Sequence, residues 1–275
     1  MRDINIRKVL GDPSTVMAAI MSSVLFLGAD SSQAAIVTIV SDSFAGTNGS
    51  AVHGRTPDTV NLPGGTWFSV GNGNPSNNPF GAPPTISGNT ALLQVNSSAF
   101  VSLQSSGGYT KPTQFTISGD LRVGSINQNN LGVGLAFNNI NSDFSSALRI
   151  TLGITGDLNF NQTLIASYNA GNFGGNGFNP NNFYHLTYTV DISSGGVSGI
   201  TLSNGLGSQN YTLSTTAFTN AMTAFAAIYS NAANVGTSGN IDNFLVSAVP
   251  EPSALVLLLG MGSAVFGRRR RRSAR

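Results

Sequence analysis

An alternation of apolar and polar residues runs through the stretch Phe183-Tyr-His-Leu-Thr-Tyr-Thr-Val-Asp-Ile192, and the cluster Ser193-Ser-Gly-Gly196 follows it. Alternation at a period of two is typical of a β-strand with one buried and one exposed face. Consecutive small polar residues and glycines indicate a turn. The stretch therefore predicts a strand that ends in a turn, and its buried face carries Tyr184, Leu186, Tyr188, Val190 and Ile192.

The same alternation recurs elsewhere, over residues 115–123, 131–137 and 148–154, and residues 241–247 predict a final strand. Residues 215–230 fit a helix, although 224–229 fit another strand equally well. Residues 71–84 and 169–182 have no periodicity and are predicted surface loops. Together the segments predict an all-β chain that folds as an antiparallel β-sandwich, with a jelly roll as its topology.

Composition favours one domain with one core. The 275 residues include no cysteine, which excludes disulfides and thiolate metal sites, and only 9% are charged. The formal net charge of +2 comes from the two ends of the chain, because residues 36–248 carry four basic residues and seven aspartates, a net charge of −3. A mildly acidic body without a basic stripe does not fit a phosphate backbone, so no nucleic-acid partner is expected.

The N-terminus has the order of a secretory signal peptide: basic residues, an apolar run at 16–28 that predicts a signal helix, and then small polar residues. A buried helix of the folded domain is the alternative. Ser32 and Ala34 have the small side chains that a signal peptidase accepts, so cleavage is expected after Ala34, with Ala35 as the alternative. The predicted division is a signal peptide at 1–34, a β-sandwich domain at 35–248 and a C-terminal sorting segment at 249–275.

The C-terminal segment contains three features in a fixed order. It begins with Val249, Pro250, Glu251 and Pro252, whose prolines favour an extended backbone. An uncharged apolar run at 254–267 predicts a short transmembrane helix, about 21 Å long against a hydrocarbon layer of roughly 30 Å. A cluster of basic residues follows, and its positive charge is expected to hold the C-terminal end of the helix on the cytoplasmic side of the membrane. The cluster consists of Arg268, Arg269, Arg270, Arg271 and Arg272.

This order resembles the PEP-CTERM sorting domain of Gram-negative bacteria. The resemblance implies that residues 249–252 are the sorting motif that an exosortase, a membrane cysteine protease, recognises and cuts. It implies that the arginine cluster is a stop-transfer signal. It also implies a transient stay in the inner membrane, followed by delivery to the cell surface or an extracellular matrix. A tail anchor that is never processed is the alternative.

Parts of the body resemble concanavalin A-like and laminin-G-like jelly rolls. Residues 183–200 are similar to the back-sheet hairpin of these domains, in which an aromatic-rich strand turns into a second strand. Asp42-Ser-Phe44 and Ile241-Asp-Asn-Phe244 resemble their paired first and last strands. The resemblance implies a fold that is commonly used for carbohydrate binding, and a fold alone does not define a function.

No catalytic residues are expected. A glycosidase needs two carboxylates that flank the scissile bond, but residues 36–248 contain no glutamate and their aspartates are scattered. His53 and His185 are the only histidines. Without a close carboxylate partner, both are expected to be ordinary surface residues rather than catalytic bases or zinc ligands. The protein is therefore predicted to be no enzyme and to need no cofactor.

Two binding hypotheses remain. Asp42 and Asp242 would meet if the first and last strands pair, and they are candidate ligands for a structural calcium ion, with turn stabilisation as the alternative. Exposed aromatic rings can stack on sugars, although a core role explains the only tryptophan equally well. The candidate carbohydrate contacts, in or near loops rich in Asn and Gly, are Trp67, Tyr109, Phe173 and Phe178.

These patterns predict a non-enzymatic structural or adhesive protein of the cell surface or extracellular matrix, exported and sorted through its C-terminal signal. The alternative is a carbohydrate-binding module that acts on exopolysaccharide. The expected partners are signal peptidase, exosortase, exopolysaccharide and, transiently, the inner membrane.

Overall fold

The computed structural model describes residues 36–62, 65–69, 83–94, 97–103, 112–125, 132–137, 148–194, 196–213, 225–230 and 238–248. The predicted signal peptide with Ala34 and Ala35, the candidate contact Tyr109, and the whole segment 249–275 lie outside these residues. Within the described ranges, no helix is long and apolar enough to cross a membrane.

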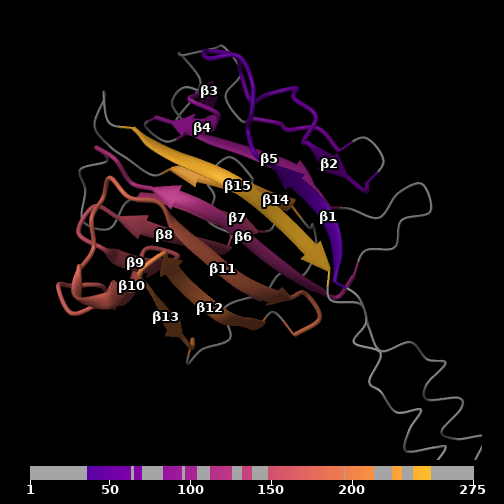
Figure 1. Ribbon diagram of the computed structural model, residues 1–275. Coiled ribbons are helices and arrows are strands. Elements are labelled where there is room, and N and C mark those ends of the chain that lie inside the picture. The colour runs from indigo at the N-terminus through magenta and orange to yellow at the C-terminus, as the bar shows by residue number, and fades with distance from the viewer. Residues whose placement is uncertain are drawn as a thin grey trace, which may run out of the picture. The chain divides into compact units, whose positions relative to one another are not determined.

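The larger of two antiparallel sheets contains nine strands (Figure 1). They are β1 (Val37–Asp42), β2 (Thr59–Val60), β3 (Thr85–Ser87), β4 (Thr90–Leu93), β6 (Gln114–Arg122), β11 (Tyr184–Asp191), β12 (Gly196–Asn204), β13 (Gly207–Tyr211) and β15 (Gly239–Ala248). The strand order is β13-β12-β11-β6-β15-β1-β2, with β4 also paired to β15 and β3 paired to β4. The last strand of the described chain therefore lies inside the sheet, between β6 and β1.

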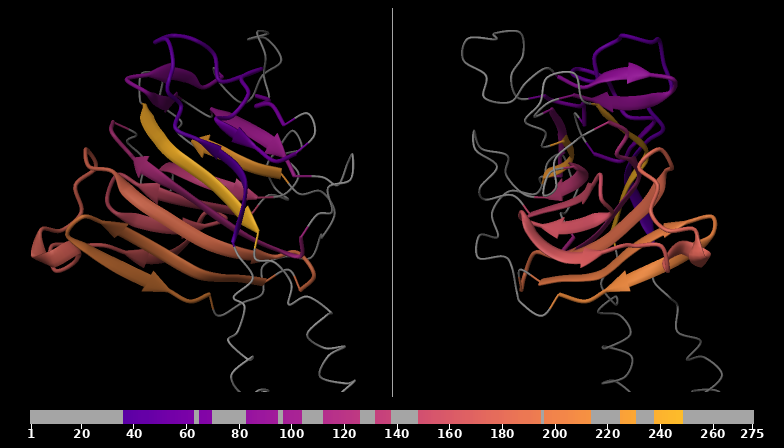
Figure 2. Two further views of the ribbon diagram at one scale, coloured as in Figure 1. Left: turned by 45° about the vertical axis from the view of Figure 1, so that its right-hand side comes forward. Right: turned by 90° about the vertical axis from the view of Figure 1, so that its left-hand side faces the viewer.

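The smaller sheet contains six strands in the order β10-β9-β8-β7-β14-β5. They are β5 (Ser98–Ser102), β7 (Gly132–Phe137), β8 (Leu148–Gly153), β9 (Asp157–Phe160), β10 (Thr163–Ser167) and β14 (Phe225–Ser230). Edge-on, the two sheets form two layers of a sandwich (Figure 2).

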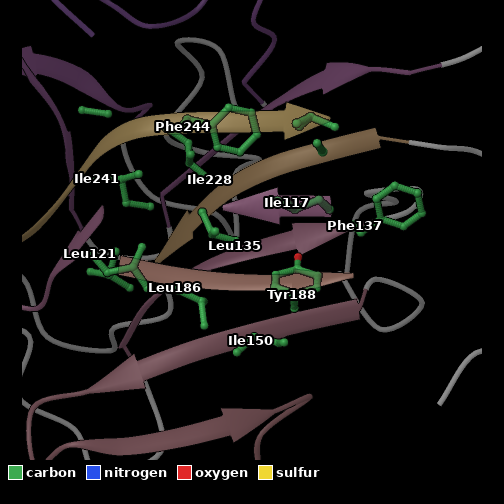
Figure 3. Close-up of a cluster of buried hydrophobic side chains, with 14 of the residues drawn as sticks. Ile117, Leu121, Leu135, Phe137, Ile150, Leu186, Tyr188, Ile228, Ile241 and Phe244 are labelled. Atoms are coloured by element: carbon green, nitrogen blue, oxygen red, sulfur yellow. The ribbon is translucent and has the colours of Figure 1, made fainter. Parts of the chain in front are cut away.

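The core lies between the inner faces of the two sheets. Ile117, Leu186 and Phe244 come from the nine-stranded sheet, and Leu135 and Ile228 from the six-stranded sheet, and all belong to one buried cluster (Figure 3). The rings of Phe115 on β6 and Phe137 on β7 lie 5.5 Å apart between centroids, which joins the layers directly. The predicted antiparallel sandwich with a jelly-roll fold is confirmed.

The predicted strand positions are confirmed where the structure describes them. Residues 183–200 form a hairpin in which β11 pairs with β12, and its predicted inner residues from Tyr184 to Val190 are buried. The first and last strands also pair, with Val37 opposite Ala248 and Asp42 opposite Phe244. Within residues 215–230, Phe225–Ser230 is a strand, so for that part the strand alternative is confirmed over the helix.

A β-bulge explains why two residues three positions apart both reach the core from β15. The register with β6 shifts between Asp242 and Leu245, and Asn243 has a φ of 47°, in the left-handed region that Asn tolerates better than most residues. The extra residue turns the strand, so that Ile241 and Phe244 both point inward and Asn243 remains exposed.

Candidate functional site

The outer face of the six-stranded sheet is formed by the side chains that alternate with its core residues. On β8, for example, Leu148, Ile150 and Leu152 are buried in the core, so Arg149 and Thr151 point to the opposite side. The outer-face residues found in this way are Ser98, Phe100, Ser102, Gly132, Gly134, Ala136, Arg149, Thr151, Asn159, Phe225, Ala227 and Tyr229.

The strand register places aromatic rings and an arginine at opposite ends of one row. Phe100 lies opposite Ala227, Ala227 opposite Ala136, and Ala136 opposite Arg149. Three strand steps of about 4.8 Å each separate the backbones of Phe100 and Arg149 by about 14 Å. The side chains between the two ends of the row are therefore small.

An aromatic cluster occupies the β5 end of the row. Phe68 joins the edge of the sheet through two backbone hydrogen bonds with Phe100, at 2.8 and 2.7 Å, and their rings stack with centroids 6.0 Å apart. Phe225 meets Phe100 edge-on at 5.4 Å, and His53 meets Phe68 edge-on at 6.2 Å. The Phe68 residue is 44% exposed, so the cluster presents an apolar ring to solvent. Such a ring can stack on the apolar face of a sugar.

Arg149 and Tyr229 meet across β7, on which Gly134 and Ala136 provide the space between them. Arg149 Nη1 donates a hydrogen bond to the Tyr229 hydroxyl at 3.2 Å, and the guanidinium carbon lies 5.7 Å from the ring centroid. A Cβ atom on Gly134 would collide with the backbone of Ile150 and Thr151. Burial raises the pKa of Tyr229 above its usual 10.0, although the Arg149 charge opposes the shift, so the phenol is protonated at neutral pH.

Orphaned polar atoms gather at this face. Among the described residues, five buried side-chain atoms have no hydrogen-bond partner. Three lie on the outer face, namely Ser98 Oγ, Arg149 Nε and Asn159 Oδ1. The fourth is Oγ of Ser69, the residue after Phe68 in the sequence. The fifth is the Tyr188 hydroxyl in the core. Each such atom costs about 1–3 kcal/mol, and all of them are buried, so a polar ligand could satisfy them only where this face becomes exposed.

Carboxylates are scarce on the same face. Among its described residues, β9 contributes one aspartate, Asp157, whose carboxylate accepts hydrogen bonds from Thr155 and Ser167 at 2.7 and 2.6 Å. The face therefore offers an exposed ring, Phe68, but its described part lacks the pair of carboxylates that glycoside hydrolysis needs.

The predicted aromatic contacts lie elsewhere. Trp67 and Phe173 are both fully buried, so the prediction that they contact a carbohydrate is wrong: neither offers a free ring face. Phe173 belongs to a short 3₁₀ turn (Phe173–Gly175) that anchors the predicted loop 169–182 to the core, 4.9 Å from the Tyr184 ring. Phe178 is half-buried and stacks on Tyr184 at 4.8 Å.

Asp42 is occupied by protein donors. Its Oδ1 accepts from the Phe44 amide at 2.8 Å and from Arg55 Nη2 at 2.9 Å, and its Oδ2 accepts from Arg55 Nε at 3.0 Å and Trp67 Nε1 at 2.7 Å. A carboxylate has about four acceptor positions, so none remains for calcium. The prediction of Asp42 as a calcium ligand is therefore wrong, and its physical reason is the arginine beside it.

Asp242 belongs instead to a polar row on the outer face of the nine-stranded sheet. It lies opposite Asp120, which lies opposite His185. His185 Nδ1 and Asp120 Oδ1 are 2.6 Å apart, so the expectation that His185 lacks a close carboxylate is wrong. Burial, together with the charges of Asp120 and Asp42, raises the pKa of Asp242. No group of three or more His, Asp or Glu side chains suited to a metal occurs within the described residues.

Comparison with known proteins identifies the C-terminal segment. Residues 248–272 match the PEP-CTERM protein-sorting motif, as the order of features in the tail predicted. The chain is therefore an exported protein that is sorted to the cell surface, and the motif implies recognition by an exosortase. No curated protein sequence matches the chain.

Several solved structures are similar in fold. A pseudo β-1,3-glucanase of Mycobacterium tuberculosis matches with a TM-score of 0.43 and 14% identity, over 77% of this chain and 98% of that one. An endo-1,3-β-glucanase from Streptomyces sioyaensis matches with a TM-score of 0.40 and 11% identity, over 81% and 100% of the two chains. Lectin I-B4 from Griffonia simplicifolia matches with a TM-score of 0.38 and 12% identity, over 59% and 89%.

Proposed function

We propose that this protein is a non-enzymatic, adhesive protein of the cell surface or extracellular matrix that attaches to polysaccharide through the outer face of its six-stranded sheet. The observation that carries the proposal is the combination on one face of an aromatic cluster, Phe68, Phe100 and Phe225, whose Phe68 ring is exposed, with orphaned polar atoms of Ser98 and Asn159. Stacked rings beside hydrogen-bonding groups are what a sugar ring requires.

The absence of a catalytic constellation within the described residues supports a binding role. The only glutamate of the chain is in the sorting tail, and the described outer face contributes Asp157 alone. His185 and Asp120 form a pair, but among the described residues no hydroxyl donates to or accepts from His185 to complete a nucleophilic triad. Hydrolysis of a polysaccharide that is lost when one specific aspartate is substituted would instead support a hydrolase function.

The route to the surface forms part of the proposal. Signal peptidase would remove residues 1–34, the tail would hold the protein briefly in the inner membrane, and an exosortase would cut near Val249–Pro252. The support for this route is the match to the sorting motif and the basic, apolar and small-residue order of the N-terminus.

Polysaccharide binding by the purified full chain in mild detergent tests the proposal. A panel of neutral and acidic polysaccharides is immobilised, and the wild-type chain is compared with Phe68→Ala and with Leu206→Ala. Leu206 is a matched control, because it is another exposed apolar residue, 58% exposed, in the turn between β12 and β13 of the other sheet.

We expect Phe68→Ala to weaken binding by roughly tenfold, taking as a guide the value of about 1–3 kcal/mol for a nucleic-acid base stacked on an aromatic ring. Leu206→Ala should bind as the wild type does. Binding to no polysaccharide would leave a purely structural role, and equal loss in both variants would exclude the outer face as the site.

A further inference from the structure

Arg149 differs from the other two described arginines in the contacts of the guanidinium edge formed by Nε and Nη2. An arginine binds a planar acceptor through Nε and Nη2, which point the same way. Arg55 uses this edge on the Asp42 carboxylate, at 3.0 and 2.9 Å. Arg122 uses it on Oδ1 of Asn240, at 3.2 and 2.9 Å. In both cases the chain itself provides the acceptor.

The same edge of Arg149 has no acceptor among the described residues. Its one side-chain hydrogen bond leaves from Nη1, toward Tyr229, and its Nε is buried without a partner. No carboxylate of the described residues forms an ion pair with it. Tyr229 does not neutralise the charge, because its hydroxyl is protonated. Among the residues that the structure describes, therefore, no negative charge compensates the guanidinium on the outer face.

The position of the guanidinium is fixed. Asn161 holds the Arg149 backbone from both sides: its Oδ1 accepts from the Arg149 amide at 2.8 Å, and its own amide donates to the Arg149 carbonyl at 2.9 Å. Tyr229 then holds Nη1 and lies beneath the guanidinium plane. A fork that is held in place loses little conformational freedom on binding, which favours a planar, bidentate acceptor.

We infer that the Nε–Nη2 edge of Arg149 binds a carboxylate of the polysaccharide, and that the ligand is consequently an acidic, uronate-containing chain rather than a neutral glucan. This inference rests on the proposed function. A carboxylate matches the fork in shape and charge, and supplies the acceptor that Nε lacks. The aromatic cluster, about 14 Å away along the row, stacks on a second sugar of the same chain. Nε is buried in the free protein, and Ala136 and Ala227 in the row are only 0% and 1% exposed, so binding requires this row to become exposed to the ligand.

The charge of the rest of the protein makes this contact selective. Residues 36–248 carry a net charge of −3, so a polyanion is not attracted by the body as a whole. Binding of an acidic polysaccharide must therefore depend on a local positive group. Arg149 is the one described arginine on the outer face, because Arg122 lies on β6 of the other sheet.

The test compares binding of the same polysaccharide with and without its carboxylate charges. The purified full chain is titrated with polygalacturonate, with the same polymer fully methyl-esterified, and with dextran sulfate. Three variants accompany the wild type: Arg149→Lys keeps the charge without the fork, Arg149→Gln removes the charge, and Arg122→Gln removes an equal charge from the other sheet. Circular dichroism checks that each variant is folded.

We expect the wild-type chain to bind polygalacturonate and to bind the methyl ester at least roughly tenfold more weakly. Both Arg149 variants should bind polygalacturonate more weakly than the wild type by a similar factor, because a charge-assisted pair is lost. Arg122→Gln should match the wild type. If the ester binds as tightly as polygalacturonate, or if only neutral polysaccharides bind, the inference is overturned and the proposed function stands. Dextran sulfate binding that equals polygalacturonate, with Arg149→Lys unaffected, would also overturn it. If an Arg149 variant does not fold, the comparison of acid and ester with the wild-type chain decides.

Discussion

The buried carboxylate of Asp42 offers a sharp test of what holds the first strand in place. Asp42 is 1% exposed and accepts four hydrogen bonds, two from Arg55 and one each from Trp67 and the Phe44 amide. In Asp42→Asn, one oxygen becomes an NH₂ group that faces donors. Two donors then lose their acceptor, and the partly buried Arg55 loses its principal counter-charge.

The magnitude follows from the burial of the pair. Removing one partner of a buried ion pair costs about 3–5 kcal/mol, which lowers the melting temperature of a domain of this size by about 6–20 °C. The matched control is Asp58→Asn. Asp58 also contacts Arg55 Nη2, at 3.0 Å, but its side chain is 43% exposed, so its ion pair is worth about 1 kcal/mol or less.

Denaturant unfolding measures both variants. Trp67 is the only tryptophan, and its indole donates to Asp42, so its fluorescence reports on this site while far-ultraviolet circular dichroism reports on the sheets. Coincident transitions establish two-state behaviour. If Asp42→Asn unfolds with the same free energy as Asp58→Asn, the four hydrogen bonds do not stabilise the fold as reasoned.

Two further predictions concern stability. Burial alone would raise the pKa of Asp120, but hydrogen bonds with His185 and Asn243 lower it below its usual 3.8, so its contribution is present above that value and is lost as the pH falls through the lower, folded-state pKa. Unfolding free energies measured from about pH 5 to about pH 2 should therefore fall less steeply in Asp120→Asn than in the wild type; identical slopes would contradict this. Phe173→Ala should cost about 3–5 kcal/mol of unfolding free energy, because the ring is fully buried beside Tyr168 and Tyr184. A loss below about 1 kcal/mol in denaturant unfolding would show that the 3₁₀ turn does not depend on this anchor.

The strands that could be predicted are those whose pattern is long and local. Residues 115–123 and 184–192 alternate over nine positions each, and both became strands with the expected face inward. The shorter strands β5, β9 and β10 have five residues or fewer, too few for an alternation to stand out from chance. The bulge in β15 also breaks the period, because Asn243 adds a residue between two inward ones.

The candidate site was harder to predict, because it depends on pairings between distant parts of the chain. Trp67 and Phe68 are neighbours, and the sequence alone does not show which ring points inward; the buried acceptor Asp42, 25 positions earlier, decides it by binding the indole. Arg149 and Tyr229 are 80 positions apart and meet only because β7 separates their strands. Once Ser98–Ser102 is known to be a strand, its alternation places Phe100 on the face opposite to Ala99 and Val101.

The place of β15 inside its sheet has a mechanical consequence. Force applied to the chain beyond Ala248 acts along a strand of ten residues that is hydrogen-bonded to β6 on one side and to β1 and β4 on the other. A pull that runs parallel to the strand loads these backbone hydrogen bonds together in shear rather than opening them one after another. Along that direction the protein resists inside its larger sheet rather than at an edge strand.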